Sequence, residues 1–337
     1  MRKTYRFLII ILLQTCFAIT TSAQESNLKE DYSAYLPEIR ALNKMLSQIP
    51  HTGTVLTKDG LLSARNMMKS FAGGKTILQP TFQNIKGPGG DLSLMIFKPD
   101  TINAIVLDIH GGAWSVGVAA NDAALNDEMA RTCHVAVVSV EYRLAPEFPF
   151  PACIEDCKAA ARWLLGSAKK EFGTDKIFIS GASAGGHLAA VTTLYIRDSL
   201  KAIEKIKGVN LQYGCFDLNR TPSNRLVTDS TLLLYKKSLD ESFKLVFGNW
   251  TLQQLQNPEY SPLYADLKGL PPALFTVGTA DPLIDDTFFM ETRWRNAGNK
   301  TFLAVYPECP HGLNILPTKI AKVANARMYK WIIDLCK

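Results

Sequence analysis

The stretch that decides the fold of this chain is residues 176–190, KIFISGASAGGHLAA. A short apolar run ends at Ser180, a Gly-x-Ser-x-Gly motif follows at 181–185, and residues suited to a helix begin directly after it. A turn this tight between a strand and a helix requires very small flanking residues and leaves the hydroxyl of Ser183 exposed at the edge of a sheet. The first turn of the following helix favours negative charge nearby. The pattern therefore indicates a reactive serine rather than an ordinary turn.

The rest of the chain alternates short apolar runs with helix-length segments from about residue 88 onward. The predicted strands are 92–97, 104–109, 135–140, 176–180, 209–211, 273–278 and 302–306, and the predicted helices are 122–132, 152–172, 184–198, 286–296 and 318–336. This alternation predicts an α/β fold with a mostly parallel sheet and helices on both faces. A polar, helical-looking insertion at 215–262 interrupts it and is expected at the carboxyl ends of the strands, where such sheets bind ligands.

A serine hydroxyl is a weak nucleophile until a base accepts its proton, so Ser183 needs a partner such as histidine. The chain has five histidines. His311 follows the last predicted strand, at the same carboxyl edge as the serine turn, and is predicted to be the base. The remaining histidines lie in an N-terminal helical region, at strand ends, or on the helix behind the serine: His51, His110, His134 and His187.

The acid that orients the histidine should lie between the serine and the histidine, because the order along such a chain is serine, acid, histidine. The predicted strand 273–278 ends shortly before Asp281. We therefore predict that Asp281 holds the imidazole in the correct tautomer and stabilises its charged form. Asp285 and Asp286 begin the next helix and are interpreted as capping and dipole charges.

A second glycine-rich loop, HGGAW at 110–114, follows another predicted strand. Glycines let the main chain approach a substrate carbonyl closely, and main-chain amides can stabilise the negative oxygen of a tetrahedral intermediate. We predict that the N–H groups of Gly111, Gly112 and Ala184 form this oxyanion hole, Ala184 being the residue directly after the serine. His110 is interpreted as a structural hydrogen-bonding residue.

Residues 1–23 are predicted to be a signal peptide. Three basic residues precede an apolar run over 7–19, which is short for a membrane span, and small residues at 21–23 suit a cleavage site. Cleavage after Ala23 would lower the formal net charge from +6 to about +3 and predicts a secreted or periplasmic protein. An uncleaved anchor is the alternative, whereas the residue before Cys16 is a poor match for a lipid-anchored form.

Composition restricts the partners of the chain. The mild positive charge and the lack of a basic run argue against nucleic acid, and no other stretch of the sequence is apolar enough for stable membrane insertion. Six of the seven cysteines would remain after cleavage. Cys153 and Cys157 are poorly spaced for a disulfide, and no further ligands complete a metal site beside them, so buried free thiols are predicted over disulfides or metal.

Five motifs occur together in a fixed order: HGGAW at 110–114, EYRLAPE at 141–147, GASAGGH at 181–187, DPLID at 281–285 and PHG at 310–312. This set resembles the hormone-sensitive-lipase-like esterases of the α/β-hydrolase superfamily. The resemblance covers 88–337 and implies an α/β-hydrolase domain with a helical cap, built from an N-terminal segment, 24–87, and from the 215–262 insertion. The EYRLAPE motif is interpreted as structural, packing the loop beneath the site.

The resemblance implies a serine hydrolase of small carboxylic esters that uses neither a metal nor an organic cofactor. Short acyl groups are expected, because bulky Trp114 follows the oxyanion glycines and both cap segments are short. The GASAGGHLA stretch is also similar to secreted carbohydrate esterases, so an acetyl xylan or feruloyl esterase is the alternative. A catalytically silent binding protein and an amidase are less favoured, because all triad positions are filled and no peptide-binding domain is evident.

The chain departs from the pattern of these esterases at three positions. The family usually has a third glycine where this chain has Ala113, an acidic residue where it has Ala182, and asparagine where it has His187. The first difference is expected to tighten the acyl side of the pocket. The other two leave the predicted catalytic residues in place.

Overall fold

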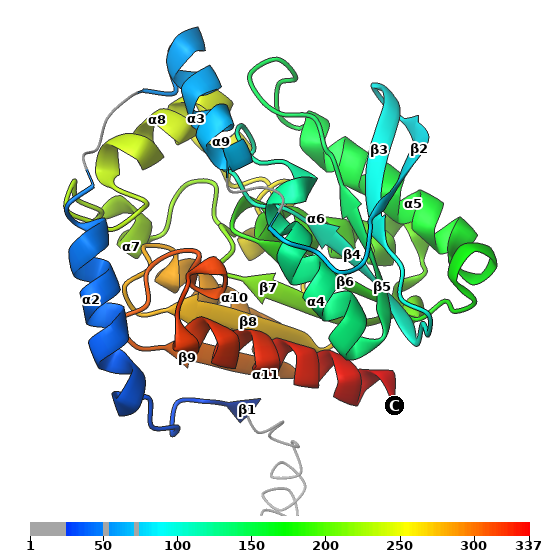
Figure 1. Ribbon diagram of the computed structural model, residues 1–337. Coiled ribbons are helices and arrows are strands. Elements are labelled where there is room, and N and C mark those ends of the chain that lie inside the picture. The colour runs from blue at the N-terminus through cyan, green and yellow to red at the C-terminus, as the bar shows by residue number, and fades with distance from the viewer. Residues whose placement is uncertain (1–24, 50–53, 71–73) are drawn as a thin grey trace, which may run out of the picture.

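In the computed structural model, which describes residues 25–49, 54–70 and 74–337, nine strands form one sheet (Figure 1). Their order is β1-β9-β8-β7-β6-β4-β5-β3-β2. Strand β3 is antiparallel to β2 and β5, and the other pairs are parallel. The bounds are β1 Glu25–Ser26, β2 Thr81–Gly87, β3 Gly90–Phe97, β4 Ala104–Ile109, β5 Val135–Val140, β6 Ile177–Ala182, β7 Ile206–Gln212, β8 Ala273–Gly278 and β9 Thr301–Tyr306.

The central strands lie in the core of the molecule. Every residue of β4, β5 and β8 is buried, as nearly continuous apolar runs predict for parallel strands covered on both faces. These three strands have the bounds that the sequence predicts. Strand β7 is longer than the predicted 209–211, because Lys207, Gly208 and Gln212 interrupt the apolar pattern on either side of the predicted segment, although Gly208 and Gln212 pair with β6. The predicted mostly parallel α/β fold is confirmed.

Helices cover both faces of this sheet (Figure 1). Helices α4 and α11 pack on one face, and α5, α6 and α10 pack on the other. Their bounds are α4 Ala123–Cys133, α5 Ala152–Phe172, α6 Ala184–Tyr195, α10 Ile284–Asn296 and α11 Lys319–Cys336. The helix predicted over 184–198 therefore ends early, and a π-helical turn, Ile196–Leu200, follows it.

The sheet begins earlier in the chain than the predicted domain start at residue 88. Strands β1 and β2 lie in the segment 24–87, which the sequence assigned wholly to the cap. Both are edge strands without an apolar run: β2 buries only Ile85, and β1 is two residues long. The side-chain amide of Asn27 extends the β1 pairing, since it both accepts from and donates to the main chain of Val305.

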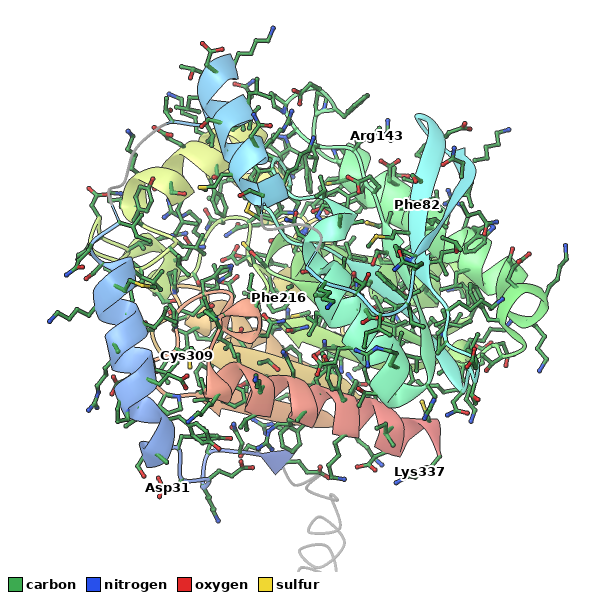
Figure 2. All side chains as sticks on the ribbon, in the orientation of Figure 1. Asp31, Phe82, Arg143, Phe216, Cys309 and Lys337 are labelled. Carbon is green, nitrogen blue, oxygen red and sulfur yellow. The ribbon has the colours of Figure 1, made fainter. Side chains whose placement is uncertain are left out.

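The cap lies at the carboxyl ends of the parallel strands and comes from two parts of the chain (Figure 1). Helices α2 (Leu36–Leu46) and α3 (Lys58–Ser70) belong to the N-terminal segment, and α7 (Pro222–Arg225), α8 (Lys236–Phe247) and α9 (Leu252–Leu255) belong to the insertion. The two parts meet where the N–H of Val55 donates to Glu241. The insertion begins near Phe216, which is fully buried and is labelled in Figure 2.

The described residues do not include every position that the sequence interpretation concerns. The predicted signal peptide, with Cys16, and also His51 lie outside the described residues. Within the described part of the chain, no helix has the length and apolar character needed to cross a bilayer. The six described cysteines are all free, and five of them are buried.

Candidate active site

Ser183 stands between β6 and α6 in a strained backbone conformation, with φ 57° and ψ −121°. Such strain persists only where the surroundings enforce it, and it is typical of active sites. The turn is enforced by close main-chain contact: a Cβ atom on Gly185 would lie 1.9 Å from the carbonyl oxygen of Ile109. Only glycine fits there, so the predicted strand–turn–helix geometry is present.

His311 lies between Ser183 and Asp281. Its Nε2 is 2.9 Å from Ser183 Oγ, and its Nδ1 is 2.8 Å from Asp281 Oδ2. A carboxylate only accepts hydrogen bonds, so Nδ1–H donates to Asp281, which leaves the Nε2 lone pair to accept the serine proton. Asp281 is buried, and its other oxygen accepts from the N–H of Leu283 at 2.8 Å. The structure thus joins three residues from three loops in one hydrogen-bonded chain.

The predicted oxyanion glycines lie beside the serine. A Cβ atom on Gly111 would lie 3.4 Å from Ser183 Cβ, and Gly112 has a φ of 117°, which favours glycine. Ala184 is the first residue of α6, where N–H groups have no acceptor within the helix. All three predicted residues therefore lie within the strand-end region that holds Ser183.

This fold and this site can be compared with known proteins. A family model described as the α/β hydrolase fold matches residues 106–315. An arylesterase of Saccharolobus solfataricus is 36% identical over 201 residues, which cover 58% of this chain and 64% of that protein. The carboxylic ester hydrolase LipN of Mycobacterium tuberculosis is 31% identical over 265 residues, covering 75% of this chain and 70% of that protein.

A solved structure titled as a hormone-sensitive lipase from a metagenome library matches with a TM-score of 0.76 and 27% identity, covering 89% of this chain and 98% of that one. The chain belongs to the α/β-hydrolase fold family. The resemblance to hormone-sensitive-lipase-like esterases is confirmed, since the proteins that this α/β hydrolase matches are named as esterases, as an ester hydrolase or as a hormone-sensitive lipase. The chain spans slightly less than two thirds of the arylesterase it matches.

Two further histidines of this α/β hydrolase are engaged away from the serine. His187 accepts a hydrogen bond from Trp114 Nε1 at its Nδ1 (3.1 Å), so its Nε2–H donates to the carbonyl oxygen of Tyr260 (2.6 Å). His110 stacks on Tyr142, with ring centroids 4.1 Å apart. Burial lowers the pKa of each of these imidazoles to about 4. The interpretation of His110 as a structural residue is supported, because its Nδ1 also lies 2.8 Å from the carbonyl oxygen of Gly111.

The carboxylates that follow Asp281 do more than predicted. Asp285 and Asp286 lie in the first turn of α10 but do not cap it. Asp286 is fully buried and accepts hydrogen bonds from the start of the insertion, namely from Phe216 N, Asp217 N and Thr221 Oγ1. Burial raises the pKa of Asp286 to about 7, although these hydrogen bonds act in the opposite direction. Asp285 accepts from the N–H of Ser223, so both carboxylates anchor the cap insertion.

Tyr213 is a site residue that the sequence analysis missed. Its ring packs edge-on against His311, with centroids 4.7 Å apart, and its hydroxyl donates to Asn314 Oδ1. Tyr213 directly follows β7, the strand next to the one that ends at the serine turn. The sequence could have indicated Tyr213 by its position at the end of a strand next to β6. Because the predicted strand ended at residue 211, Tyr213 was not recognised as a residue at a strand end.

Helix α2 contacts the loop that carries His311. Glu308 forms a two-point ion pair with Arg40, and its carbonyl oxygen accepts from Asn43 Nδ2 at 2.8 Å. The N–H of Glu308 donates to Thr279 Oγ1 at 2.8 Å, in the loop that leads to the buried acid. The N-terminal part of the cap is therefore connected to both loops that meet at the histidine.

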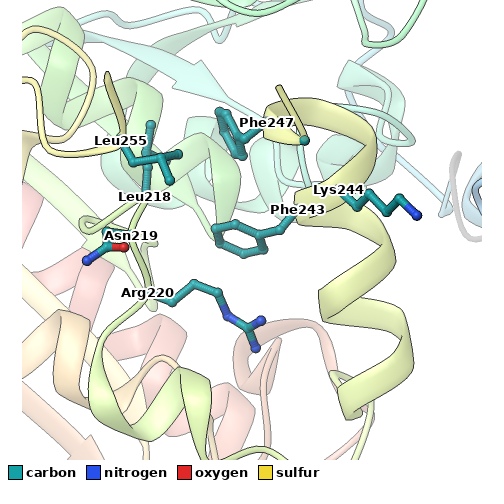
Figure 3. A pocket seen from close by; sticks show the side chains of 8 residues that line it. Leu218, Asn219, Arg220, Phe243, Lys244, Phe247 and Leu255 are labelled. Carbon is teal, nitrogen blue, oxygen red and sulfur yellow. The ribbon is translucent and has the colours of Figure 1, made fainter. Parts of the chain in front are cut away.

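Aromatic side chains connect the insertion to the oxyanion loop. Trp114 is 3% exposed and makes edge-on contacts with Phe247 and Phe243 of α8, at centroid distances of 5.1 and 6.0 Å. The same two phenylalanines, with Leu218 and Leu255, line a cavity of about 450 Å³ (Figure 3). Arg220 borders this cavity, and its guanidinium lies over the Phe243 ring.

The remaining interpretations concern structural residues and metal binding. Tyr142, in the EYRLAPE motif, donates to the carbonyl oxygen of His110 at 2.9 Å, so this motif packs beneath the site as predicted. Ala113 and Trp114 both adopt positive φ, 48° and 58°, although the family usually has glycine at the first of them. Over residues 25–49, 54–70 and 74–337, no group of three or more His, Cys, Asp or Glu side chains is arranged to hold a metal ion.

Proposed function

We propose that this α/β hydrolase cleaves carboxylic esters through an acyl-enzyme intermediate on Ser183, with His311 as base and Asp281 as the orienting acid. The observation that carries this proposal is the hydrogen-bonded chain from Ser183 Oγ through both His311 nitrogens to Asp281. A hydroxyl, a base within hydrogen-bond reach of it and a buried group that fixes the base are the requirements for an activated serine.

In the first half of the reaction, His311 Nε2 accepts the hydroxyl proton as Ser183 Oγ attacks the ester carbonyl carbon. The negative charge develops on the carbonyl oxygen, where the N–H groups of Gly111, Gly112 and Ala184 would donate to it. Asp281 stabilises the imidazolium that forms. The imidazolium then gives its proton to the departing alkoxide, so an alcohol leaves and an acyl group remains on the serine.

In the second half, water replaces the alcohol. His311 accepts a proton from the water, whose oxygen attacks the acyl carbon, and the same oxyanion groups stabilise the second tetrahedral intermediate. Collapse of this intermediate breaks the bond to the serine oxygen, which regains its proton from the imidazolium. The acid product leaves, and the enzyme returns to its starting state without any cofactor in the reaction.

The test of this function is covalent labelling combined with ester hydrolysis. A fluorophosphonate probe should label the wild-type protein at Ser183 and abolish hydrolysis of p-nitrophenyl acetate. The Ser183→Ala variant should bind no label and lose about 10³-fold or more in kcat. Labelling at another residue, or substantial turnover by Ser183→Ala, would refute the proposal.

We also propose a preference for short acyl groups, which rests on Trp114. Its indole is buried, hydrogen-bonded to His187 and packed on two phenylalanines, so it is held in place two residues after Gly112. An added methylene contributes up to about 0.8 kcal/mol only where apolar wall remains to bury it. A fixed indole would limit the apolar surface that is available to a long acyl chain on one side of the site.

The first 23 residues are further proposed to direct export and to be removed after Ala23. Cleavage at this position would leave the described sheet whole, because β1 begins at Glu25 and pairs with β9. Mass spectrometry of protein from the cell envelope or medium would test it: the mature N-terminus should be Gln24, and a full-length cytoplasmic product would contradict it.

A further inference from the structure

The loop that follows the oxyanion glycines is strained. Gly112, Ala113 and Trp114 all have positive φ, at 117°, 48° and 58°, and two of these three residues are not glycine. Backbone in such conformations persists only when surrounding contacts hold it. The loop supplies part of this support itself, because the carbonyl oxygen of Gly112 accepts hydrogen bonds from the N–H groups of Ser115 and Val116.

Further support comes from outside the loop, and part of it comes from one side chain of the cap. The carbonyl oxygen of Trp114 accepts from the N–H of Ala145 at 3.0 Å. Arg65, on helix α3, donates through Nε to the carbonyl oxygen of Ser115 at 2.8 Å and through one terminal nitrogen to that of Ala145 at 2.9 Å. Arg65 therefore holds both the strained loop and the segment that supports it.

Arg65 also forms an ion pair with Glu147. The two terminal nitrogens of Arg65 reach the two oxygens of Glu147, at 2.8 and 2.7 Å. The Arg65 side chain is only 20% exposed, whereas that of Glu147 is 52% exposed. An ion pair with so exposed a partner contributes little by itself. The burial of Arg65 is therefore best explained by its two hydrogen bonds to the carbonyl oxygens of Ser115 and Ala145.

Helix α3 presents Arg65 to the loop on its inner face. Leu61 is the buried residue of this helix, and Ala64, Arg65 and Met68 are partly buried at helical spacing from it. The carbonyl oxygen of Met68 also accepts a hydrogen bond from Asn121 Nδ2, just after the oxyanion loop. The only charged side chain on this inner face of the helix is thus the one that contacts the loop.

We propose that Arg65 is a positioning residue for the oxyanion hole: the N-terminal cap segment holds the N–H groups of Gly111 and Gly112 in their catalytic orientation through Arg65. This proposal rests on the proposed function. Lysine cannot replace the arginine, because a single ammonium does not reproduce planar donors that serve Ser115 O and Ala145 O together. The proposed esterase site is therefore complete only when α3 packs against the loop that follows the oxyanion glycines.

The experiment compares wild type with Arg65→Ala and Arg65→Lys. The matched control is Glu147→Gln, which removes the ion pair but leaves Arg65 able to reach the carbonyl oxygens of Ser115 and Ala145. Competent sites are first counted by burst titration, and rates are expressed per competent site. We expect kcat of both Arg65 variants to fall about 10- to 100-fold, with KM changed less than about threefold. Glu147→Gln should stay within about threefold of wild type.

A second readout separates positioning from general destabilisation. A trifluoromethyl ketone forms a tetrahedral adduct whose oxyanion occupies the hole, so its inhibition constant should weaken in the Arg65 variants by the same factor as kcat/KM. Any one of three results would overturn this proposal. The two Arg65 variants could retain wild-type kcat per competent site, their inhibition constants could be unchanged, or Glu147→Gln could lose as much kcat as they do. Failure of the proposed function is distinguishable, because wild type itself would then show neither labelling at Ser183 nor a burst.

Discussion

Asp281 Oδ2 accepts a hydrogen bond from His311 Nδ1 at 2.8 Å, whereas Asp285, four residues later, accepts one from the main chain of Ser223. Two neighbouring carboxylates thus serve different structures, the histidine and the cap. Asp281→Asn should lower kcat by about 10³- to 10⁴-fold, because an amide can stabilise the wrong imidazole tautomer and carries no charge. Asp285→Asn should stay within about tenfold of wild type. Steady-state kinetics of both variants decides this, and a larger loss in Asp285→Asn would show that the acid is wrongly assigned.

Acyl-chain preference should reflect the fixed position of Trp114. With p-nitrophenyl esters from acetate to dodecanoate, kcat/KM should peak between about two and six carbons and be lower by octanoate, since added methylenes then find no further apolar wall. Trp114→Ala should shift the optimum to longer chains. A rate that climbs to dodecanoate in wild type, or activation at a lipid–water interface, would contradict the short-acyl proposal. Deacetylation of acetylated xylan in parallel tests the carbohydrate-esterase alternative.

The pH dependence of stability should report on Asp286. Burial raises its pKa from 3.8 to about 7, so the native state retains a proton that the unfolded chain has already released. The contribution of this group to the free energy of unfolding is therefore complete below about pH 4 and decreases as the pH rises toward 7. Asp286→Asn removes this titration and should show a shallower decrease between pH 4.5 and 7.5.

Chemical denaturation of wild type and variant at several pH values measures this difference. The comparison has to be made between the two proteins, because Asp122 also has a pKa raised by burial, to about 8, and contributes to the slope of both. Identical slopes for wild type and Asp286→Asn would contradict the prediction.

Glycine substitutions offer a matched test of the serine turn. A Cβ atom on Gly185 would lie 1.9 Å from the carbonyl oxygen of Ile109, whereas one on Gly166, inside α5, would meet nothing within 4 Å. Gly185→Ala should cost at least about 3 kcal/mol or prevent folding, because main chain cannot move away. Gly166→Ala should stabilise the protein by about 0.5–1 kcal/mol through helix propensity. Thermal and denaturant unfolding measure the stability of both variants. If Gly185→Ala were as stable as wild type, the close contact between Gly185 and Ile109 would be contradicted.

The sequence predicted those elements whose local residue pattern directly reflects their place in the folded protein. Strands β4, β5 and β8 are apolar throughout because they are buried on both faces, so their bounds were readable. The serine turn was readable because its glycines are sterically required. Edge strands β1 and β2 were missed, since a strand with a solvent-exposed face and few residues carries little apolar signal.

Contacts between distant segments could not be predicted from one sequence. Nothing local distinguishes Arg65 from other surface arginines, yet it reaches three residues at 115–147. Likewise Asp286 has the sequence position of a helix-dipole charge but receives its hydrogen bonds from residues about 65 to 70 positions earlier. Such roles depend on how the cap packs on the sheet, which is a property of the assembled fold.

The most direct test of the central claim is the mass of the enzyme during turnover. After rapid mixing with p-nitrophenyl acetate and an acid quench, the wild-type protein should release p-nitrophenol in a burst and carry one acetyl group, located by peptide mapping on Ser183. Ser183→Ala should show neither the burst nor the added mass. The proposed mechanism would be contradicted by an acetyl group on another residue during catalysis. It would also be contradicted if wild type hydrolysed the ester steadily with no acylated protein and Ser183→Ala turned over at an unchanged rate.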